Sequence, residues 1–448
     1  MSGRDTPNGI GRRAALARLL GPTVWIVVGQ GYAKLMSFAA YFLMVRHLAP
    51  EDVGLVALCW LWVAVGDTFF DAGLGQAYVR DGVRDARAES TLFWALLGLA
   101  VLWTAAALGV GPLLARAFDE PEIVPAMAAL SLIFPLKALG WTQLSVQIVE
   151  RRVMSITARD VIAATVASAL GVALAWAGAG WWALVARLVC LPAVGSLLIA
   201  LVARWRPRAE FDRAWLGEKL RFGVPLTAAS NAHWLVVLQI EGYLVGHALG
   251  LGALGLVQFA KKPTEVLSQV MVAIQSVHLL RELSAARDSP PLWRAILRRE
   301  LALYGAFGTL VGLAGLGFAF LVVGPVWGER WSAAVPLLAV LSLAAPPIAM
   351  QAVAATALVA RGDLRALLRT NLVGAALTCA LLAFGVDHGV VGVAVAQTLA
   401  FAIVALMTLA ALRGWGPTAS GGVPTDRSAG TAPRGRPRGR SARRRTRA

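Results

Sequence analysis

The chain has 448 residues, of which 58% are apolar and 15% are charged, and its formal net charge is +17. Soluble domains usually contain about 45–50% apolar and about 25% charged residues, so an assembly of soluble enzyme domains is excluded. Much of the positive charge has a local origin, because ten Arg and one acidic residue lie from Arg413 onward. We therefore expect no nucleic-acid partner.

Long apolar segments follow one another along most of the chain. An apolar run of about 18 residues or more can cross the hydrocarbon layer as a helix, whereas a membrane β-barrel would show shorter alternating segments. The sequence predicts an all-α polytopic membrane protein with about twelve transmembrane helices, at 23–45, 53–79, 91–115, 123–148, 161–178, 181–203, 222–248, 252–280, 300–324, 332–359, 366–386 and 389–412.

The basic residues lie in alternate connections between these segments. The connections before the first span and after every second span hold, within them or at their edges, 34 of the 42 Lys and Arg. The opposite connections hold three, namely Arg46, Arg116 and Arg330. Cytoplasmic connections carry the excess of Lys and Arg, so we expect a protein of the inner (cytoplasmic) cell membrane with both termini in the cytoplasm.

A basic connection divides the chain into two halves. We expect a basic cytoplasmic N-terminus at 1–22, a six-helix lobe at 23–203, a linker at 204–221, a second six-helix lobe at 222–412 and a disordered Arg-rich tail at 413–448. A weak repeat supports this division: LMVRHL at 43–48 is followed by Gly54, and LVGHAL at 244–249 is followed by Gly255. Two such halves would be related by an axis along the membrane normal, as in some transporters.

Two cytoplasmic connections contain helix-start signals. Asp212 can cap a helix N-terminus, and Ser289 precedes two prolines, an order typical of a first helical turn. Apolar residues follow each signal on one helical face. We expect two short helices lying on the inner membrane surface.

Several charged residues fall inside the predicted spans. A charged side chain at a helix centre costs about 2.5–3.5 kcal/mol on insertion scales, so such residues tend to face a partner or a wet cavity. Most of them lie in spans 1, 2, 7 and 8, the equivalent pairs of the two halves, which predicts a polar cavity between the lobes. The charged residues inside the predicted spans are Lys34, Asp67, Asp71, Lys137, Arg187, Glu241, Lys261, Lys262 and Glu265.

These residues are assigned different roles. Lys34, Lys261 and Lys262, with the amides of Asn231 and Gln239, are candidates for binding a substrate in the cavity. Four carboxylates are candidates for tuning the cavity or carrying a coupling ion: Asp67, Asp71, Glu241 and Glu265. An ion pair between Lys261 and Glu265, four residues apart, is an alternative. Lys137 and Arg187 follow a proline or lie near a turn, so both could extend to a membrane surface instead.

The sequence gives no support for nucleotide binding, nucleophilic catalysis or a metal site. The chain has no Gly-rich phosphate loop with its Lys and Ser/Thr, no nucleophile–His–acid arrangement, and three widely separated cysteines, Cys59, Cys190 and Cys379. We therefore predict no catalytic residue, no metal site and no cofactor. A carrier driven by H⁺, Na⁺ or a substrate gradient remains.

Two motifs in the first lobe resemble a known family. RHLAPEDVGL at 46–55 is similar to the "R-x-L-x-P-x-x-(Y/F)-G" turn of polysaccharide-biosynthesis membrane proteins, with Val53 in place of the aromatic residue. DAGLGQAYVR at 71–80 is similar to the end of their second span. These are the Wzx-type oligosaccharide flippases of the multidrug/oligosaccharidyl-lipid/polysaccharide (MOP) exporter superfamily, which includes the multidrug and toxin extrusion (MATE) transporters.

The resemblance implies alternating access between two six-helix lobes. The implied cargo is a polyprenyl-pyrophosphate-linked oligosaccharide, moved from the cytoplasmic to the outer leaflet for surface polysaccharide synthesis, with other assembly proteins as further partners. Lys34, Lys261 and Lys262 would then meet the pyrophosphate or acidic sugars. Three alternatives stay open: a drug or cation antiporter of the same superfamily, which needs an acidic cavity; a membrane-embedded glycan polymerase or ligase, which needs a large outer loop; and a scaffold.

Overall fold

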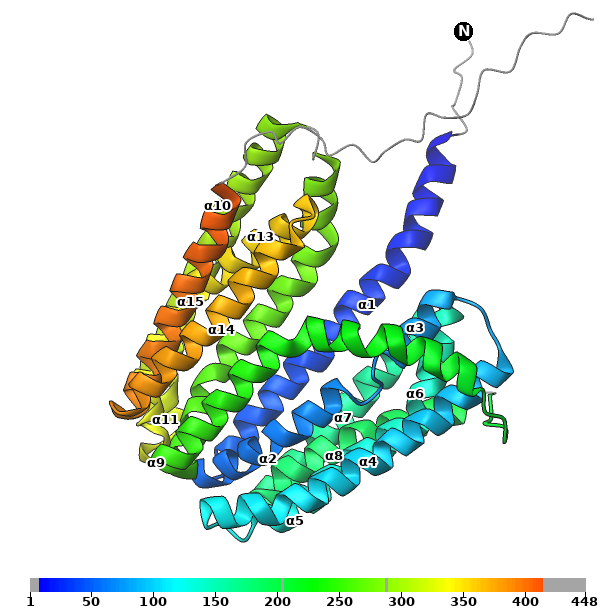
Figure 1. Ribbon diagram of the computed structural model, residues 1–448. Helices are drawn as coiled ribbons and strands as arrows, with labels where there is room; N and C mark the ends of the chain where they lie inside the picture. The colour runs from blue at the N-terminus through cyan, green and yellow to red at the C-terminus, as the bar shows by residue number, and fades with distance from the viewer. Residues whose placement is uncertain (1–7, 203–204, 287–288, 414–448) are drawn as a thin grey trace, which may run out of the picture. The chain divides into compact units, whose positions relative to one another are not determined.

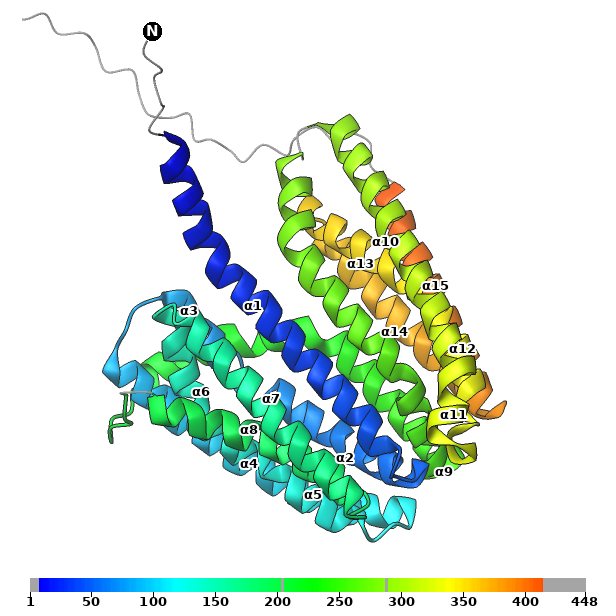
Figure 2. The same ribbon diagram turned by 180° about the vertical axis from the view of Figure 1, so that it is seen from behind.

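The chain folds into helices joined by short turns. The computed structural model describes residues 8–202, 205–286 and 289–413, and for 8–24, 26–27, 222, 225–226, 228–238, 266–277, 364 and 413 it describes the backbone alone. No strand occurs within these residues. The predicted disorder of 413–448 concerns residues outside those described, apart from Arg413. Figures 1 and 2 show the helices from opposite sides.

The helices follow the predicted spans closely. The first half of the chain contains α1 (Asn8–Val45), α2 (Pro50–Thr68), α3 (Leu74–Asp81), α4 (Ala86–Phe118), α5 (Ile123–Ser131), α6 (Ile133–Val149), α7 (Val153–Trp176) and α8 (Trp182–Val202). The second half contains α9 (Arg213–Ala285), α10 (Pro290–Phe318), the π-helix η1 (Ala319–Val323), α11 (Gly324–Trp327), the 3₁₀-helix η2 (Glu329–Trp331), α12 (Ala334–Ser342), α13 (Ala345–Arg361), α14 (Leu364–Val386) and α15 (Gly389–Arg413).

Length and composition identify fewer spans than twelve. Each of the twelve predicted segments coincides with helix, but in the described part of the chain eight helices, or nine with the bent pair α12–α13, are long and apolar enough to cross a membrane. The 19-residue α2 carries Glu51, Asp52 and Asp67, which lower its hydropathy. The protein is a multi-pass, all-helical membrane protein, and the count of twelve stays a prediction.

The two helix-start signals in the sequence were located correctly, but the lengths of several helices were not. Helix α1 begins at Asn8, well before the predicted span, because a helix can continue beyond the apolar residues that face lipid. The Asp212 carboxylate accepts bonds from the backbone N–H groups of Ala214 and Trp215, as a cap does, and Ser289 precedes α10. The expected short surface helices are wrong, since both starts lead directly into long helices.

Helix α9 joins the two halves of the chain. Its two arms meet at Gly250, where φ is 86° and ψ is 169° and the helical conformation is interrupted. The helix contacts α2, α3 and α4 in the first half and α12, α13 and α14 in the second (Figure 1). Near its start, Lys219 lies 2.8 Å from Asp81 at the end of α3. This pair raises the pKa of Lys219.

The two halves approach most closely where α2 crosses α9. A Cβ atom added to Gly54 would overlap the carbonyl oxygen of Leu251, and one added to Gly255 would overlap that of Pro50. Gly54 and Gly255 occupy equivalent positions in the weak repeat that the sequence suggests, and the structure places the two glycines together at this crossing. Small residues let helix backbones approach in this way within a membrane.

Aromatic side chains extend this contact to α10 and α11. Phe42 of α1 packs edge-on against Phe259 of α9, with ring centroids 5.2 Å apart, and against Trp327 of α11 at 5.4 Å. The indole N–H of Trp327 donates to the carbonyl oxygen of Phe42 at 2.9 Å. Aromatic pairs of this geometry contribute about 0.5–1.5 kcal/mol beyond their buried area. The C-terminal end of α1 is thereby held against the second half of the chain.

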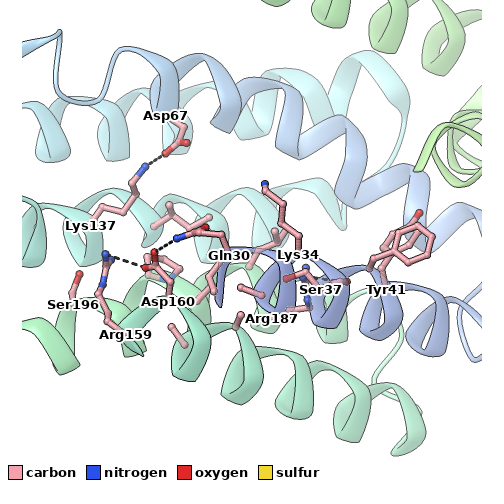
Figure 3. A pocket seen from close by; sticks show the side chains of 18 of the residues that line it. Gln30, Lys34, Ser37, Tyr41, Asp67, Lys137, Arg159, Asp160, Arg187 and Ser196 are labelled. Carbon is pink, nitrogen blue, oxygen red and sulfur yellow. Dashed lines mark hydrogen bonds and ion pairs between the residues drawn. The ribbon is translucent and has the colours of Figure 1, made fainter. Parts of the chain in front are cut away.

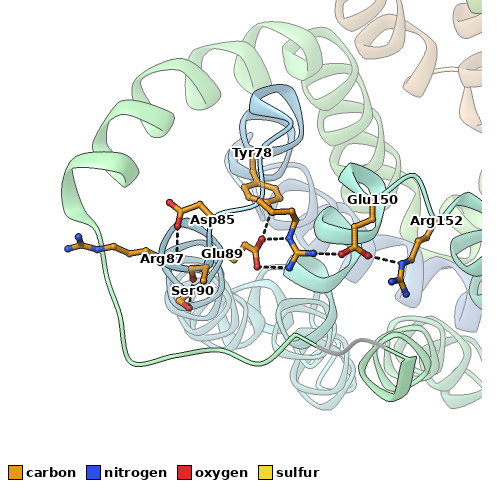
Figure 4. Close-up of polar contacts among 9 residues, drawn as sticks. Tyr78, Asp85, Arg87, Glu89, Ser90, Glu150 and Arg152 are labelled. Carbon is orange, nitrogen blue, oxygen red and sulfur yellow. Dashed lines mark hydrogen bonds and ion pairs between the residues drawn. The ribbon is translucent and has the colours of Figure 1, made fainter. Parts of the chain in front are cut away.

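A polar network joins the C-terminal end of α3, the N-terminal end of α4 and the C-terminal end of α6. The buried carboxylate of Glu89 accepts from the Tyr78 hydroxyl at 2.7 Å and from the Arg84 guanidinium at 2.5 Å (Figure 4). Arg84 also bonds Glu150, which pairs with Arg152 at 2.7 Å. Glu89 raises the pKa of Arg84. The connection at 82–85 is therefore anchored by charge to two helices.

Candidate functional site: a basic cavity beside α1

A cavity of about 510 Å³ lies among α1, α2, α6, α7 and α8, with part of its wall from α9. Figure 3 shows the polar side chains that line it. The sequence predicted a cavity between the lobes, but five of the six contributing helices belong to the first half. The described residues of the second half reach it through Lys262 and Glu265.

One face of α1 supplies the longest polar stripe in the wall. Gln30, Lys34, Ser37 and Tyr41 all line the cavity, and their spacing of four, three and four residues places them on a single helical face. The stripe extends along the cavity towards the aromatic contact at Phe42. Lys34 was predicted as a binding residue, and the structure places it in this wall.

The carboxylate of Asp67 on α2 bonds the ammonium group of Lys137 on α6. That ammonium group also lies 5.0 Å from the ring of Trp141 and 5.2 Å from the ring of Phe70. A cation over an aromatic face gains about 0.5–2 kcal/mol, depending on exposure. Lys137 therefore belongs to the cavity wall, where the sequence had offered a surface position as the alternative.

A second pair was missed because Arg159 and Asp160 precede the predicted fifth span. Arg159 Nη1 lies 3.3 Å from Asp160 Oδ1, and Arg159 Nε donates to the carbonyl oxygen of Gly195 at 3.0 Å. The amide of Gln30 donates to Asp160 at 2.9 Å, which connects α1 to α7. The signal that the sequence did offer was a charged pair directly before an apolar run.

The third pair lies on α9. The ammonium group of Lys262 is 2.7 Å from Glu265 Oε2 and 5.6 Å from the ring centroid of Tyr41. Both side chains of the pair are 35% exposed and line the cavity. The structure thus brings two of the predicted site residues, Lys262 and Glu265, together with Lys34.

The neighbouring Lys261 faces a different environment. Its ammonium group lies 2.6 Å from Glu241 Oε2, and the side-chain amide of Gln397 on α15 donates to the same carboxylate at 3.0 Å. Glu241 is 1% exposed, and the residues that line the cavity do not include Lys261 or Glu241. The suggested Lys261–Glu265 pair is therefore wrong, and Lys261 contributes to packing between the arms of α9 and α15.

Three other candidate residues are not part of the cavity lining among the described side chains. The amide of Gln239 donates to the carbonyl oxygen of Leu61 and so joins α9 to α2. Asp71 caps the bend between α2 and α3, accepting from Gly73 N at 3.0 Å and from Trp141 Nε1 at 3.3 Å. The side chain of Asn231 is not among those described.

The charge of the wall decides what the cavity can hold. Of the described residues that line it, five are basic and three are acidic: Lys34, Lys137, Arg159, Arg187 and Lys262 against Asp67, Asp160 and Glu265. Each carboxylate is already bonded to a basic group. Within the described residues, no group of three or more His, Cys, Asp or Glu is arranged to hold a metal ion. The surplus is positive, which suits an anionic ligand.

Known proteins are similar to this chain in sequence or in fold. The polysaccharide biosynthesis protein family matches residues 43–336. The succinoglycan biosynthesis transport protein ExoT of Rhizobium meliloti (strain 1021) is 23% identical over 321 residues, which cover 71% of this chain and 64% of ExoT. The lipopolysaccharide biosynthesis protein WzxC of Escherichia coli (strain K12) is 24% identical over 324 residues, which cover 70% and 63%. The matched region thus spans a little under two thirds of each relative.

Solved structures agree in fold. The lipid II flippase MurJ in an inward closed conformation superposes with a TM-score of 0.65 at 11% identity, covering 87% of each chain. An inward-facing multidrug resistance MATE family transporter of the MOP superfamily gives 0.61 at 15% identity, covering 87% of this chain and 97% of that one. This chain therefore belongs to the polysaccharide biosynthesis protein family and has the helical fold of the MOP superfamily.

Proposed function

We propose that this protein is a flippase that moves a polyprenyl-pyrophosphate-linked oligosaccharide across the membrane for surface polysaccharide synthesis. One observation carries the proposal: the cavity wall has a surplus of basic side chains in a chain of this family. The pyrophosphate and any acidic sugars would be neutralised by these groups, while the polyprenyl chain stays in lipid. The name of ExoT, a transport protein, and that of MurJ, a flippase, support transport across the membrane, and the name of WzxC supports a role in polysaccharide synthesis.

The cavity and the close crossing lie at different depths along α1. Lys34 lines the cavity, whereas Phe42 packs against Phe259 and Trp327. With the predicted orientation, the end of α1 and the α2–α9 crossing lie towards the outer face. The head group would then enter from the cytoplasmic side and leave after the outer contact opens, which is alternating access.

Ion coupling and further partners remain part of the proposal. Asp67 and Glu265 are carboxylates in the cavity wall that could exchange their basic partner for H⁺, Na⁺ or substrate. Polysaccharide assembly proteins on either side of the membrane would supply and consume the cargo. The inner membrane is the site where a cytoplasmic lipid-linked precursor is available. No catalytic group is assigned, since a carrier needs none.

A drug or cation antiporter is the nearest rival, because a MATE transporter shares the fold. A cationic drug needs acidic groups that remain available in the cavity. Here Asp67, Asp160 and Glu265 are each bonded to a basic side chain, and two further basic residues line the same wall. This charge balance favours the anionic cargo.

The test is a flipping assay in proteoliposomes. A short-chain polyprenyl-pyrophosphate oligosaccharide carrying a fluorophore on the sugar is placed in both leaflets, and dithionite added outside destroys the accessible fluorophore. We expect nearly all fluorescence to be lost with the protein and about half without it, because the label is divided between two leaflets. Loss of only half with well-folded protein would contradict the proposed function.

A further inference from the structure

Two residues that line the cavity carry buried polar atoms without a partner. Arg187 Nε and the Tyr41 hydroxyl oxygen are both buried, and neither has a hydrogen-bond partner in the part of the chain that the structure describes. Leaving such groups unbonded usually costs about 1–3 kcal/mol each. Both can donate a hydrogen bond, and guanidinium can do nothing else. Two buried donors on residues of the wall therefore lack an acceptor among the described residues.

The surroundings of Arg187 fit this need. Its Nη2 atom donates to the Ser37 carbonyl oxygen at 3.4 Å, which is long for such a bond. Its stem passes Gly171 of α7, where a Cβ atom would lie 3.0 Å from Arg187 Cβ, so the glycine leaves room for it. Figure 3 shows Arg187 beside Ser37 and Lys34, with Tyr41 farther along α1. Helices α1, α7 and α8 thus hold the guanidinium at the cavity.

A second arginine in the same wall provides the contrast. Arg159 donates through Nε to Gly195 at 3.0 Å and approaches Asp160 at 3.3 Å, so its charge and its Nε are already engaged. Arg187 forms no ion pair with any described residue. Two arginines of one cavity therefore differ in whether their donors are already occupied.

We propose that Arg187 and Tyr41 form an anion subsite that receives a phosphate group of the cargo; this rests on the proposed function. Planar guanidinium donates two parallel bonds to phosphate oxygens, which a Lys cannot do. Tyr41 adds a neutral donor, and Lys262, 5.6 Å from its ring, adds positive charge. This assignment moves the phosphate contact from Lys261 to a residue of α8 that the sequence had favoured as a surface group.

Binding of farnesyl diphosphate to the full chain in lipid nanodiscs tests the subsite. Farnesyl phosphate and farnesol separate the contribution of each phosphate, and inorganic pyrophosphate reports a lipid-free anion. We expect Arg187→Gln to weaken farnesyl diphosphate binding by roughly tenfold or more, as for a lost charged hydrogen bond. Arg187→Lys should restore only part of it. Tyr41→Phe should weaken it by about fivefold, as for a neutral bond.

Arg159→Gln is the matched control, because it makes the same substitution in the same wall with the same change in net charge. We expect it to weaken binding by about fivefold at most, as for a general loss of charge. Equal losses in the two Gln variants, or unchanged binding in both Arg187→Gln and Tyr41→Phe, would overturn the subsite alone. If the wild-type protein binds none of the isoprenyl phosphates, the proposed function fails as well. Thermal unfolding of each variant separates lost binding from lost folding.

Discussion

Lys261 and Lys262 are adjacent in the sequence and belong to two different regions of the molecule. Lys261 is 12% exposed and holds the buried carboxylate of Glu241, in the packed region that joins the arms of α9. Lys262 is 35% exposed, pairs with Glu265 and lines the basic cavity. Consecutive helical residues point in directions about 100° apart. A charged residue in a membrane helix can therefore be assigned to a binding site only when the side of the helix that carries it is known to face the cavity.

The largest expected effect is on the packed region. Lys261→Ala leaves Glu241 buried without its cation, and breaking a buried pair in this way typically costs about 3–5 kcal/mol. Lys262→Ala should cost less than about 1 kcal/mol, because its pair is partly exposed. Thermal unfolding in detergent, followed by tryptophan fluorescence, measures both. The double variant Lys261→Ala with Glu241→Gln should recover part of the loss; equal stability of the two single variants would contradict the comparison.

The crossing of α2 and α9 should resist any added volume. Gly54→Leu forces a side chain into the Leu251 carbonyl, and overpacking of this kind typically costs about 1–3 kcal/mol. Gly31→Ala is the control on a helix of the same half, because no atom lies within 4 Å of its added Cβ. We expect the first variant to lower the unfolding temperature clearly and the second to leave it almost unchanged. A Gly54→Leu protein as stable as wild type would show that the crossing is not closely packed.

The cavity should show the reverse pattern, with transport affected more than stability. Lys262→Ala removes a basic group that would meet the anionic head group, and we expect flipping to slow by about tenfold, as for one charged hydrogen bond. The rate is measured by the dithionite assay and divided by the amount of folded protein. Lys219→Ala, outside the cavity, provides a control for charge alone. A rate unaffected by Lys262→Ala would remove Lys262 from the site.

The smallest expected effect is the pH dependence of the stability that the Lys219–Asp81 pair contributes between α3 and α9. The Asp81 carboxylate raises the pKa of Lys219 above its ordinary value of 10.5. A raised pKa means that the folded state binds the proton more tightly, so the stabilisation is complete below pH 10.5 and is lost as the pH rises through the folded-state value. The stability difference between wild type and Lys219→Met should stay constant from pH 6 to pH 9. A difference that shrinks within that range would contradict this pairing.

The sequence predicted the helices well because apolar length is a local property. The two family motifs have structural roles. In the first motif, Asp52 accepts a hydrogen bond from the Ala49 N–H at 2.9 Å, and in the second, Gly73 adopts a φ of 76° at the bend between α2 and α3. The sequence could not decide which face of each helix meets the cavity. For Lys137, which follows a proline, and for Arg187, which lies near a turn, the sequence offered a membrane surface as the alternative, and only the packing of α1, α6 and α8 places both side chains in the cavity wall.

Spacing along α1 was a signal that the sequence did offer. Gln30, Lys34, Ser37 and Tyr41 recur on one face of an otherwise apolar helix, and all four line the cavity. The sequence could not predict the ion pairs between distant segments, because Lys137 pairs with Asp67 on another helix and Lys261 pairs with Glu241 on the other arm of α9.

The most direct measurement asks whether the sugar-bearing head group occupies the cavity. A photo-crosslinking amino acid placed at Ser37 lies in the cavity wall, whereas the same residue at Leu35 lies on an exposed face of the same helix. After irradiation with a labelled polyprenyl-pyrophosphate oligosaccharide, glycan should be recovered on the protein from position 37 and not from position 35. Equal recovery at both positions, or glycan at position 35 alone, would contradict the account.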